Sequence, residues 1–426
     1  QYGRTYQVFD AARASADYSN NGTQNHYNSH GYLYKVTSAE QLNGQPARTY
    51  HTINSMDARG NIVNEELGNG VTRSATYEHN TGLLKNLQAT LGAATFQNLE
   101  LQWDQVGNLE QRKETGNSRN LTENFLYDGL NRLKSSQVVG SSAQTLTYNA
   151  IGNITNKSDV GNYSYGAGTA GPHAVTSAGG NSYTYDANGN NISGDGRTIS
   201  YTSFDKPDEI IKGNHKVEFE YGPDRSRYRR TDTNSSNGRV TDTLYIGSVE
   251  KITNPDGSKE WKRTIGNLVI KQVFNSSGTQ TAKTEHYLLK DHLGSPSLIM
   301  DKVAQVQQTM DFDPWGARRT TNWSAMSSTE LTNTFFKNYS VSNSVGASSL
   351  TPRGFTGHEM LDEVGIIHMN GRIYDAKLGR FLQADPLIQD PFDTQSLNRD
   401  SYTGNNPLNA IDPSGFSFLK KWLGTI

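Results

Sequence analysis

Several things are missing from this chain of 426 residues, and each absence removes a class of function. It has no cysteine, which excludes disulfide bonds, thiol nucleophiles and thiolate metal sites within the chain. It has no apolar run of about 18 residues, so we expect no segment that spans a membrane. Its 40 basic and 42 acidic residues leave a formal net charge of -2, which argues against nucleic-acid binding.

Hydrophobic residues are also scarce. They make up 33% of the chain, tyrosine included, and the mean hydropathy is -0.72. A chain this polar is not expected to bury one dense core. The opening residues, from Gln1 to Arg4, lack the charged start and apolar stretch of a secretory signal. We therefore expect that Gln1 is not a natural start and that the chain is part of a longer protein.

What the chain has in abundance is a short element that recurs about every 20 to 25 residues. An aromatic or large apolar residue is followed by Asp or Asn, two variable residues, and then Gly-Asn or a relative. The five best copies start at Met56, Trp103, Tyr127, Tyr148 and Tyr185, and weaker copies start at Tyr27, Tyr77, Phe204 and Tyr221. Such recurrence indicates one supersecondary unit repeated along the chain.

Each copy has the chemistry of a tight turn between two strands. Asp and Asn side chains bond to nearby backbone NH groups, and glycine accepts a positive φ. The flanks alternate as strands do, for example at 146–148 and 154–156. We therefore predict β-hairpins with the aromatic residue at the end of the incoming strand. The fold class is all-β, with a long antiparallel sheet that curls or spirals because strand twist accumulates.

The repeats fade after about Tyr221. Residues 231–284 are rich in Ser, Thr, Asn and Gly around short strands such as 268–270, and residues 320–350 indicate a long surface loop. The stretch from Arg225 to Arg230 is locally basic. Its alternation favours a strand face that is solvated or paired across strands over a basic binding face.

Two local patterns contain parts of catalytic or metal sites. Asp291-His292 near Ser295 has components of an activated nucleophile, but a turn entering a Gly-Ser-Pro bend explains it more simply. The segment from His358 to Asp362 partly matches the zinc motif H-E-x-x-H, with Asp362 in place of the second His. We predict neither a metal nor a cofactor.

The last seventy or so residues carry the densest motifs. Their order is Arg353-Gly354-Phe355-Thr356-Gly357-His358, Gly371-Arg372-Ile373-Tyr374-Asp375, Gly379-Arg380-Phe381-Leu382-Gln383-Ala384-Asp385-Pro386, Asn405-Asn406-Pro407-Leu408 and Asp412-Pro413-Ser414-Gly415-Phe416. Together with the Tyr-Asp repeats and Asp291-His292-Leu293-Gly294, this tail resembles the rearrangement hotspot (Rhs), or YD-repeat, family. Relatives in that family include the C components of Tc toxins and the teneurins.

The resemblance implies a fold and an activity. The sheet would spiral into a hollow shell around a C-terminal toxin, with a core-associated C-terminal region. That region would cut its own chain just after the D-P-x-G-hydrophobic motif, so the scissile bond would join Phe416 and Ser417. The chain carries Phe416 where the family usually has Leu or Trp.

Similarity to the self-cleaving core of the family points to Asp385, Asp412 and Arg372 as the catalytic residues. Two carboxylates held close share one proton, which leaves one as a base toward water and the other as an acid. Arg372 would orient a carboxylate or lower its pKa. A bland alternative stays open, because Asp412-Pro413-Ser414-Gly415 also suits a type I turn and Asp385-Pro386 a similar one.

These observations divide the chain into four parts. We predict a YD-repeat shell region at 1–230, continuing shell strands with a long polar loop at 231–350, a self-cleavage region at 351–416, and the start of a payload or linker at 417–426. One expected partner is the chain's own C-terminal toxin, which would lie beyond Ile426. The other is a secretion-system or Tc-type delivery apparatus. The expected location is that of a secreted or delivered bacterial effector. An adhesion module that binds glycans and an inert structural shell remain the alternatives.

Overall fold

The computed structural model describes residues 3–11, 22–39, 46–335 and 350–420. The predicted all-β fold is confirmed, because antiparallel strands dominate and each strand of the two large sheets pairs with its neighbour in sequence. The first sheet holds β1 (Gln7–Phe9), β2 (Gly22–Tyr27), β3 (Leu33–Ser38), β4 (Thr49–Met56), β5 (Ile62–Leu67), β6 (Thr72–Tyr77), β7 (Leu84–Leu91), β8 (Ala94–Trp103), β9 (Leu109–Glu114), β10 (Leu121–Tyr127), β11 (Leu133–Val138), β12 (Gln144–Tyr148), β13 (Ile154–Lys157), β14 (Gly161–Tyr165), β15 (Val175–Ala178) and β16 (Asn181–Ser182).

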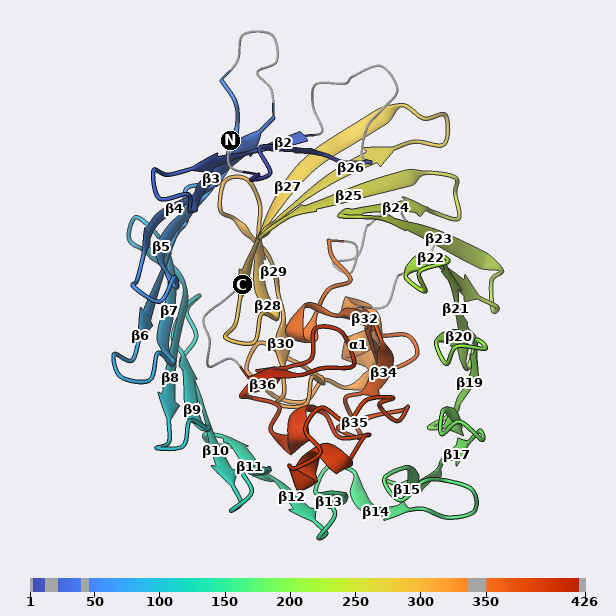
Figure 1. Cartoon of the computed structure of the whole chain (residues 1–426). Coiled ribbons are helices and arrows are strands. Elements are labelled where there is room, and N and C mark those ends of the chain that lie inside the picture. Colours follow the sequence, from blue (N-terminus) through green and yellow to red (C-terminus); the bar gives the residue numbers. More distant parts are fainter. Residues whose placement is uncertain (1–2, 12–21, 40–45, 336–349, 421–426) are drawn as a thin grey trace.

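The second sheet continues the same zigzag after Tyr183. It holds β17 (Thr184–Tyr185), β18 (Asn191–Gly194), β19 (Arg197–Tyr201), β20 (Pro207–Lys212), β21 (His215–Tyr221), β22 (Arg227–Asn234), β23 (Arg239–Ile246), β24 (Val249–Thr253), β25 (Lys259–Ile265), β26 (Leu268–Phe274), β27 (Gln280–Lys290), β28 (Pro296–Met300) and β29 (Val306–Thr309). The two sheets curve into a ring in Figure 1.

The remaining elements form a compact region, here called the interior domain (residues 311–420), which lies inside the lower half of the ring in Figure 1. It contains β30 (Asp311–Phe312), β31 (Arg318–Arg319), α1 (Ser328–Thr334), η2 (Phe355–Gly357), β32 (Glu359–Leu361), β33 (Ile366–Met369), β34 (Arg372–Asp375), β35 (Arg380–Phe381), η3 (Thr394–Leu397), η4 (Thr403–Asn405), β36 (Ala410–Ile411) and β37 (Leu419–Lys420). Strands β32 to β35 form a four-stranded sheet.

The repeated turns work as the sequence predicts. In the turn after β8, Asp104 accepts hydrogen bonds from the backbone nitrogens of Val106 and Asn108, at 2.9 and 2.7 Å. Gly107 takes a φ of +84°, which glycine adopts at no steric cost. The turn after β10 has the same form, with Asn131 at φ +61° in the glycine position. Short polar side chains thus close each hairpin locally.

In many of the repeats a tyrosine hydroxyl joins one hairpin to the preceding one. The hydroxyl of Tyr185 donates to the carbonyl of Val175 at 2.8 Å, and that of Tyr165 donates to Ile154 at 2.7 Å. The same bond recurs from Tyr127 to Leu109, Tyr148 to Leu133, Tyr201 to Asn191 and Tyr221 to Pro207. This tyrosine ladder gives a physical reason for a tyrosine at this position in these copies, whereas Met56 and Phe204 start copies without a hydroxyl.

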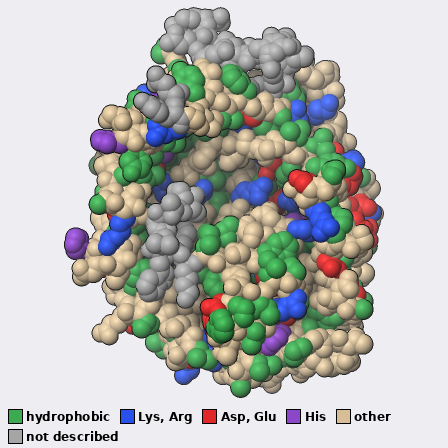
Figure 2. Space-filling view, in the orientation of Figure 1, with side chains coloured by type: hydrophobic (Ala, Val, Ile, Leu, Met, Phe, Trp, Pro, Cys, Tyr) green, Lys and Arg blue, Asp and Glu red, His purple; other side chains and the backbone are tan. Residues whose placement is uncertain are grey.

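The ring is closed by contacts between its N-terminal strands and the later strands of the second sheet. Arg48, just before β4, pairs with Glu285 of β27 at 2.5 Å, and Asp10 pairs with Arg263 of β25. Figure 1 shows the N-terminal strands lying beside β26 and β27 at the top of the ring. Figure 2 shows the same side hollowed in its upper half, with Lys and Arg side chains on the wall of the hollow.

The interior domain is docked on the inner face of the shell by apolar packing and by ion pairs. One cluster of buried residues includes Phe125 and Ile154 of the shell and Trp315, Tyr374 and Tyr402 of the interior domain. The ion pairs across the joint are Arg119–Asp311, Arg319–Glu123, Arg197–Asp375, Arg227–Glu359, Arg230–Glu359 and Arg353–Glu250. Buried pairs of this kind fix one docking geometry because breaking one leaves a charge without compensation.

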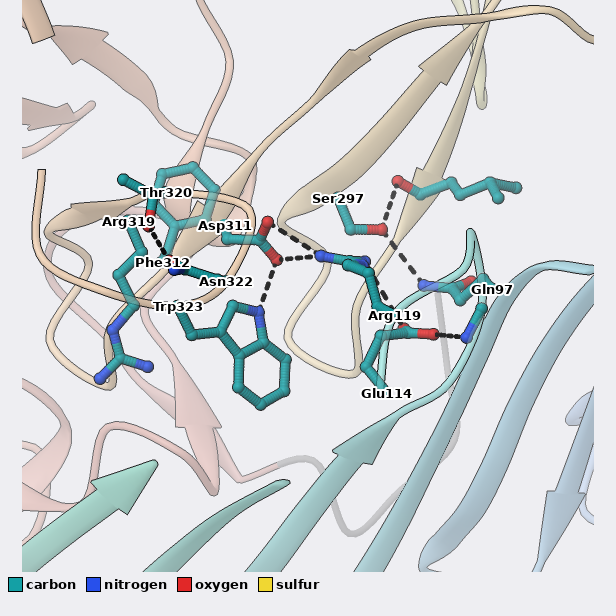
Figure 3. A network of polar contacts seen from close by, with 12 residues as sticks. Gln97, Glu114, Arg119, Ser297, Asp311, Phe312, Arg319, Thr320, Asn322 and Trp323 are labelled. Carbon is teal, nitrogen blue, oxygen red and sulfur yellow. Dashed lines mark hydrogen bonds and ion pairs between the residues drawn. The ribbon is translucent and has the colours of Figure 1, made fainter. Parts of the chain in front are cut away.

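Figure 3 shows one of these joints from close by. Arg119 lies in the shell, just before strand β10. It donates to both carboxylate oxygens of Asp311 at 2.9 and 3.0 Å. Asp311 also accepts from the indole nitrogen of Trp323 at 2.8 Å. Burial raises the pKa of Asp311, although Arg119 opposes the shift. The carboxylate therefore depends on these partners to remain charged.

The polar stretch at 320–350 differs from the predicted continuous loop. Residues 328–334 form α1, which begins with a capping box between Ser327 and Glu330. The sequence signal for this helix was the S-x-x-E spacing. Residues 336–349 lie outside the described residues. No helix among the residues that the structure describes is long and apolar enough to cross a membrane.

Candidate cleavage site

The predicted scissile bond lies in a tight hairpin loop of the interior domain. Strands β36 and β37 pair antiparallel, with Ile411 opposite Leu419, and the loop between them contains Phe416 and Ser417. Gly415 has a φ of +74°, and a Cβ atom there would lie 2.1 Å from the carbonyl oxygen of Met369. Only glycine permits this close approach of the loop to the turn between β33 and β34.

Arg372, at the start of β34, holds the loop and both predicted aspartates. Its Nη2 lies 2.9 Å from Oδ2 of Asp385 and 3.3 Å from Oδ2 of Asp412. Its Nε donates to the carbonyl of Gly415 at 2.5 Å, and its Nη1 donates to the carbonyl of Arg399 at 2.8 Å. The guanidinium is buried and lies over the ring of Phe381. One side chain thus contacts both carboxylates and the backbone next to the predicted bond.

Asp412 contacts the predicted bond directly. Its Oδ1 accepts a hydrogen bond from the backbone nitrogen of Ser417 at 3.0 Å. The hydroxyl of Ser414 also accepts from the Ser417 nitrogen, at 3.1 Å, and approaches Asp412 Oδ1 at 3.4 Å. The nitrogen that would leave during cleavage therefore lies against a carboxylate and a hydroxyl. A turn alone accounts for the Ser414 contacts but does not require Arg372 to meet Asp412.

The carbonyl end of the same bond has a partner that the sequence analysis missed. Gln389 donates from Nε2 to the carbonyl oxygen of Phe416 at 3.0 Å. The aromatic ring of Phe416 lies under the ammonium of Lys206 from the shell, 4.8 Å from the ring centroid. No spacing pattern in the sequence identifies Gln389, because it reaches Phe416 across 27 residues.

The surroundings of Asp385 shift its pKa. Burial raises the pKa of Asp385 above its ordinary value; Arg372 opposes the shift and the charge of Asp412 adds to it. Asp385 also accepts from the backbone nitrogen of Leu387 at 2.9 Å, so the turn predicted at Asp385-Pro386 is present as well. The two carboxylates approach the same guanidinium nitrogen. The positive charge of Arg372 offsets the repulsion between the carboxylates, so they can lie close together.

His358 is a histidine that contacts the loop. Its Nε2 lies 3.4 Å from the carbonyl of Pro413, and its Nδ1 lies 2.8 Å from the hydroxyl of Thr356. Burial lowers the pKa of His358 to about 4. The imidazole is therefore neutral near pH 7 and acts as a hydrogen-bonding support of the loop.

The other sequence candidates have structural roles. Asp291 accepts from the backbone nitrogens of Leu293 and Ser295, as expected for a turn, and the Ser295 hydroxyl accepts from the Thr356 nitrogen at 3.0 Å. The segment after His358 runs as strand β32, so it has no helix face for an H-E-x-x-H site. The part of the chain that the structure describes holds no group of three or more potential metal ligands.

The basic stretch at 225–230 is paired across strands. Arg229 contacts Glu220 and Asp242 of the neighbouring strands, at 2.8 and 2.6 Å. Arg227 and Arg230 both bind Glu359 of the interior domain. Within the described residues, this stretch therefore belongs to the wall and its joint.

Hairpins that close into a ring around the C-terminal part of their own chain define a YD-repeat β-shell. A family model described as Teneurin YD-shell matches residues 52–322. The chain therefore belongs to the teneurin YD-shell family, and the predicted YD-repeat membership is confirmed.

Curated relatives of the chain include large bacterial proteins. The tRNA3(Ser)-specific nuclease WapA of Bacillus spizizenii is 25% identical over 315 residues, which cover 71% of this chain and 11% of the relative. Salivary gland surface protein 1 of Aedes aegypti is 38% identical over 63 residues, covering 14% of this chain and 2% of that protein. The chain thus spans about a tenth of the WapA length.

Solved structures share the fold at low identity. The crystal structure of TcdB2-TccC3-Cdc42 matches 93% of this chain and 20% of that chain, with a TM-score of 0.73 and 18% identity. The Photorhabdus luminescens Tc holotoxin pore with the mutation TccC3-D651A matches 95% of this chain and 22% of that chain, with a TM-score of 0.68 and 17% identity. The chain spans about a fifth of each of these chains.

Proposed function

We propose that this chain is part of a toxin-encapsulating shell that cuts its own backbone between Phe416 and Ser417 and so frees a C-terminal effector held inside. The observation that carries the proposal is the hydrogen bond from the Ser417 nitrogen to Asp412. The carboxylates of Asp412 and Asp385 both form ion pairs with Arg372. The hollow ring and the relatives named as tRNA nucleases and Tc toxin components support an enclosing role.

The proposed reaction is a hydrolysis that consumes one water molecule. Water adds its oxygen to the carbonyl carbon of Phe416 while Asp412 takes a proton from it. The carbon–nitrogen bond then breaks, and Asp412 returns the proton to the Ser417 nitrogen that it already contacts. Asp385, whose pKa is raised by burial, is the acid of the pair: it moves its proton toward the Phe416 oxygen as water adds and recovers it when the carbon–nitrogen bond breaks, which an asparagine cannot do. The products are a carboxyl group on Phe416 and an amine on Ser417.

Partners and location follow from this role. The enclosed partner would be the chain's own C-terminal effector, which begins after Phe416. By analogy with the Tc holotoxin match, the shell would be secreted or delivered by a dedicated apparatus into or onto a target cell. Such an apparatus would contact the outside of the ring, while the effector occupies the hollow.

The test is the intact mass, under denaturing conditions, of a chain extended past Ile426 by its natural continuation. We expect two fragments with a boundary after Phe416, and a single uncut mass for Asp385→Asn and for Asp412→Asn. Asp256→Asn is the matched control, because Asp256 also accepts from a backbone nitrogen but lies in the shell turn between β24 and β25, outside the site. An uncut parent chain, or a cut at an Asp-Pro bond, contradicts the proposal.

The adhesion alternative receives less support. That alternative requires exposed aromatic residues of the repeats to stack on sugars. The ladder tyrosines instead donate their hydroxyls to backbone carbonyls of the neighbouring hairpin. An inert shell would be distinguished by the mass experiment, since it would stay uncut in every variant.

A further inference from the structure

We propose that Gln389 is a catalytic residue of the cleavage reaction: its side-chain amide stabilises the negative charge that develops on the carbonyl oxygen of Phe416. This inference rests on the proposed cleavage between Phe416 and Ser417. The contact that carries it is the hydrogen bond from Gln389 Nε2 to the Phe416 oxygen, at 3.0 Å.

The two ends of the bond have complementary partners. Asp412 accepts from the Ser417 nitrogen, and Gln389 donates to the Phe416 oxygen. When water adds to the carbonyl carbon, the oxygen gains negative charge and its hydrogen bond to a fixed donor strengthens. The proton needed by the nitrogen comes from Asp412, so the neutral amide of Gln389 transfers no proton and only stabilises charge.

The position of Gln389 is set by the same segment that carries Asp385. Asp385 accepts from the Leu387 nitrogen, and this turn directs the chain back toward the loop that contains Phe416. The loop itself is held by Arg372 through the Gly415 carbonyl. The donor and both aspartates are thus arranged around one peptide bond by neighbouring backbone contacts.

Arg372 does not supply the same donor. Its three nitrogens contact the carbonyls of Gly415 and Arg399 and the two carboxylates. Lys206 lies over the ring of Phe416 and donates to the carbonyls of Asn370 and Gly371 at 3.1 and 3.3 Å. Among the contacts of the described residues, Gln389 is the side-chain donor to the reacting oxygen.

The experiment measures the rate of cutting in the extended chain during timed cell-free synthesis, with the fragments resolved by mass. Loss of one such donor slows an enzyme by about 100-fold or more in a closed site; because Gln389 is exposed, we expect about 10- to 100-fold for Gln389→Ala. Gln307→Ala, at an exposed glutamine of strand β29, is the matched control and should cut at the parent rate.

A second variant separates charge stabilisation from a structural role. Gln389→Glu keeps the shape but loses the donor when ionised and regains an O–H donor when protonated, below about pH 4 to 5. Uncut Gln389→Glu and Gln389→Ala chains are purified and transferred to buffers of decreasing pH. We expect the ratio of their cutting rates, Glu over Ala, to rise about 10-fold as the pH falls through this range.

The outcomes distinguish this inference from the proposed function. A parent chain that cuts while Gln389→Ala cuts at the same rate overturns the inference and leaves the proposed function intact. A Glu-to-Ala ratio that does not change with pH also overturns it, because a packing role would not depend on the proton. An uncut parent chain overturns the proposed function itself.

Discussion

At the scale of single residues, the cleavage loop depends on one left-handed glycine. Gly415 combines a φ of +74° with a backbone oxygen 2.1 Å from where a Cβ would lie. A side chain there forces the loop away from Arg372 and Asp412. Since a misplacement of about 1 Å costs roughly 100-fold in rate, Gly415→Ala should leave most of the extended chain uncut.

The control for this variant is Gly247→Ala. Gly247 has a φ of +60° in the turn before β24, but a Cβ there meets nothing within 4 Å. It imposes a similar backbone cost of about 1 kcal/mol without displacing the site. Intact mass measured at fixed times after synthesis reports both variants. Equal cutting in the two would show that the loop position does not matter.

The pH dependence of cleavage follows from the surroundings of Asp385. Because burial raises the pKa of Asp385, this carboxyl keeps its proton to a higher pH than an ordinary aspartic acid. In the proposed reaction Asp385 is protonated and Asp412 ionised. The rate should therefore fall as the pH rises through the raised pKa of Asp385, at a pH above the ordinary value of about 4.

The measurement uses an uncut extended chain held in denaturant and diluted into buffers from about pH 4 to about pH 8. Fragments are quantified against time. A rate that climbs steadily across the whole range would indicate a base with a higher pKa and exclude the assignment of Asp385.

Part of the site was within reach of the sequence. The ordered tail identified Asp385, Asp412, Arg372 and the bond after Phe416, and the structure brings these groups together, although their catalytic roles stay a prediction. Gln389 was out of reach, because its importance arises only when the chain folds back 27 residues onto Phe416. The shared guanidinium nitrogen is likewise a three-dimensional feature.

At the scale of elements, the turn chemistry was predictable and the links between hairpins were not. The D-x-x-G-N pattern specifies its own turn through local hydrogen bonds, as at Asp104 and Gly107. The tyrosine hydroxyls instead bond to a carbonyl in the preceding hairpin, and a local pattern cannot name that partner. Helix α1 was also not predicted. Its capping box is visible in the sequence, but it lies inside an otherwise polar stretch that indicates a loop.

The tyrosine ladder makes a stability prediction. Tyr185→Phe removes the hydroxyl that bonds to the Val175 carbonyl at 2.8 Å and leaves that acceptor without its donor. The free energy of unfolding should fall by about 1 to 2 kcal/mol. Tyr32→Phe, at a side chain that is 58% exposed, is the control and should change it by less than about 0.5 kcal/mol. Urea denaturation followed by tryptophan fluorescence compares the two; an unchanged midpoint for Tyr185→Phe would show that the ladder adds no stability.

At the scale of the whole molecule, Glu359 joins the interior domain to the shell. It lies on β32 and binds Arg227 and Arg230 of β22, and it accepts from the Tyr245 hydroxyl at 2.6 Å. Burial opposes its charge most strongly, yet Arg227, Arg230 and Arg353 together hold the pKa of Glu359 well below its ordinary range. Its depressed pKa therefore contributes stability above the unfolded value of about 4.3, and this stability is lost as the pH falls through the folded pKa.

Glu359→Gln should consequently lower the free energy of unfolding by about 3 to 5 kcal/mol at pH 7, because it leaves buried arginines without their carboxylate. Glu218→Gln, which removes a half-exposed pair with Lys216, should cost at most about 1 kcal/mol. Denaturation curves at pH 7 and at about pH 3 test both points. The difference between parent and Glu359→Gln should shrink at the lower pH, and a constant difference would contradict the electrostatic origin.

The strand order has a consequence for timing. In the described part of the chain, every shell strand from β1 to β29 pairs with its neighbour in sequence, so the wall can grow hairpin by hairpin as the polypeptide emerges. The groups around the scissile bond come last and rest on a wall that is already built, through pairs such as Arg197–Asp375. Under the proposed cleavage, the cut therefore comes only after the shell has formed. A severed chain shows that the container was finished before its contents were released.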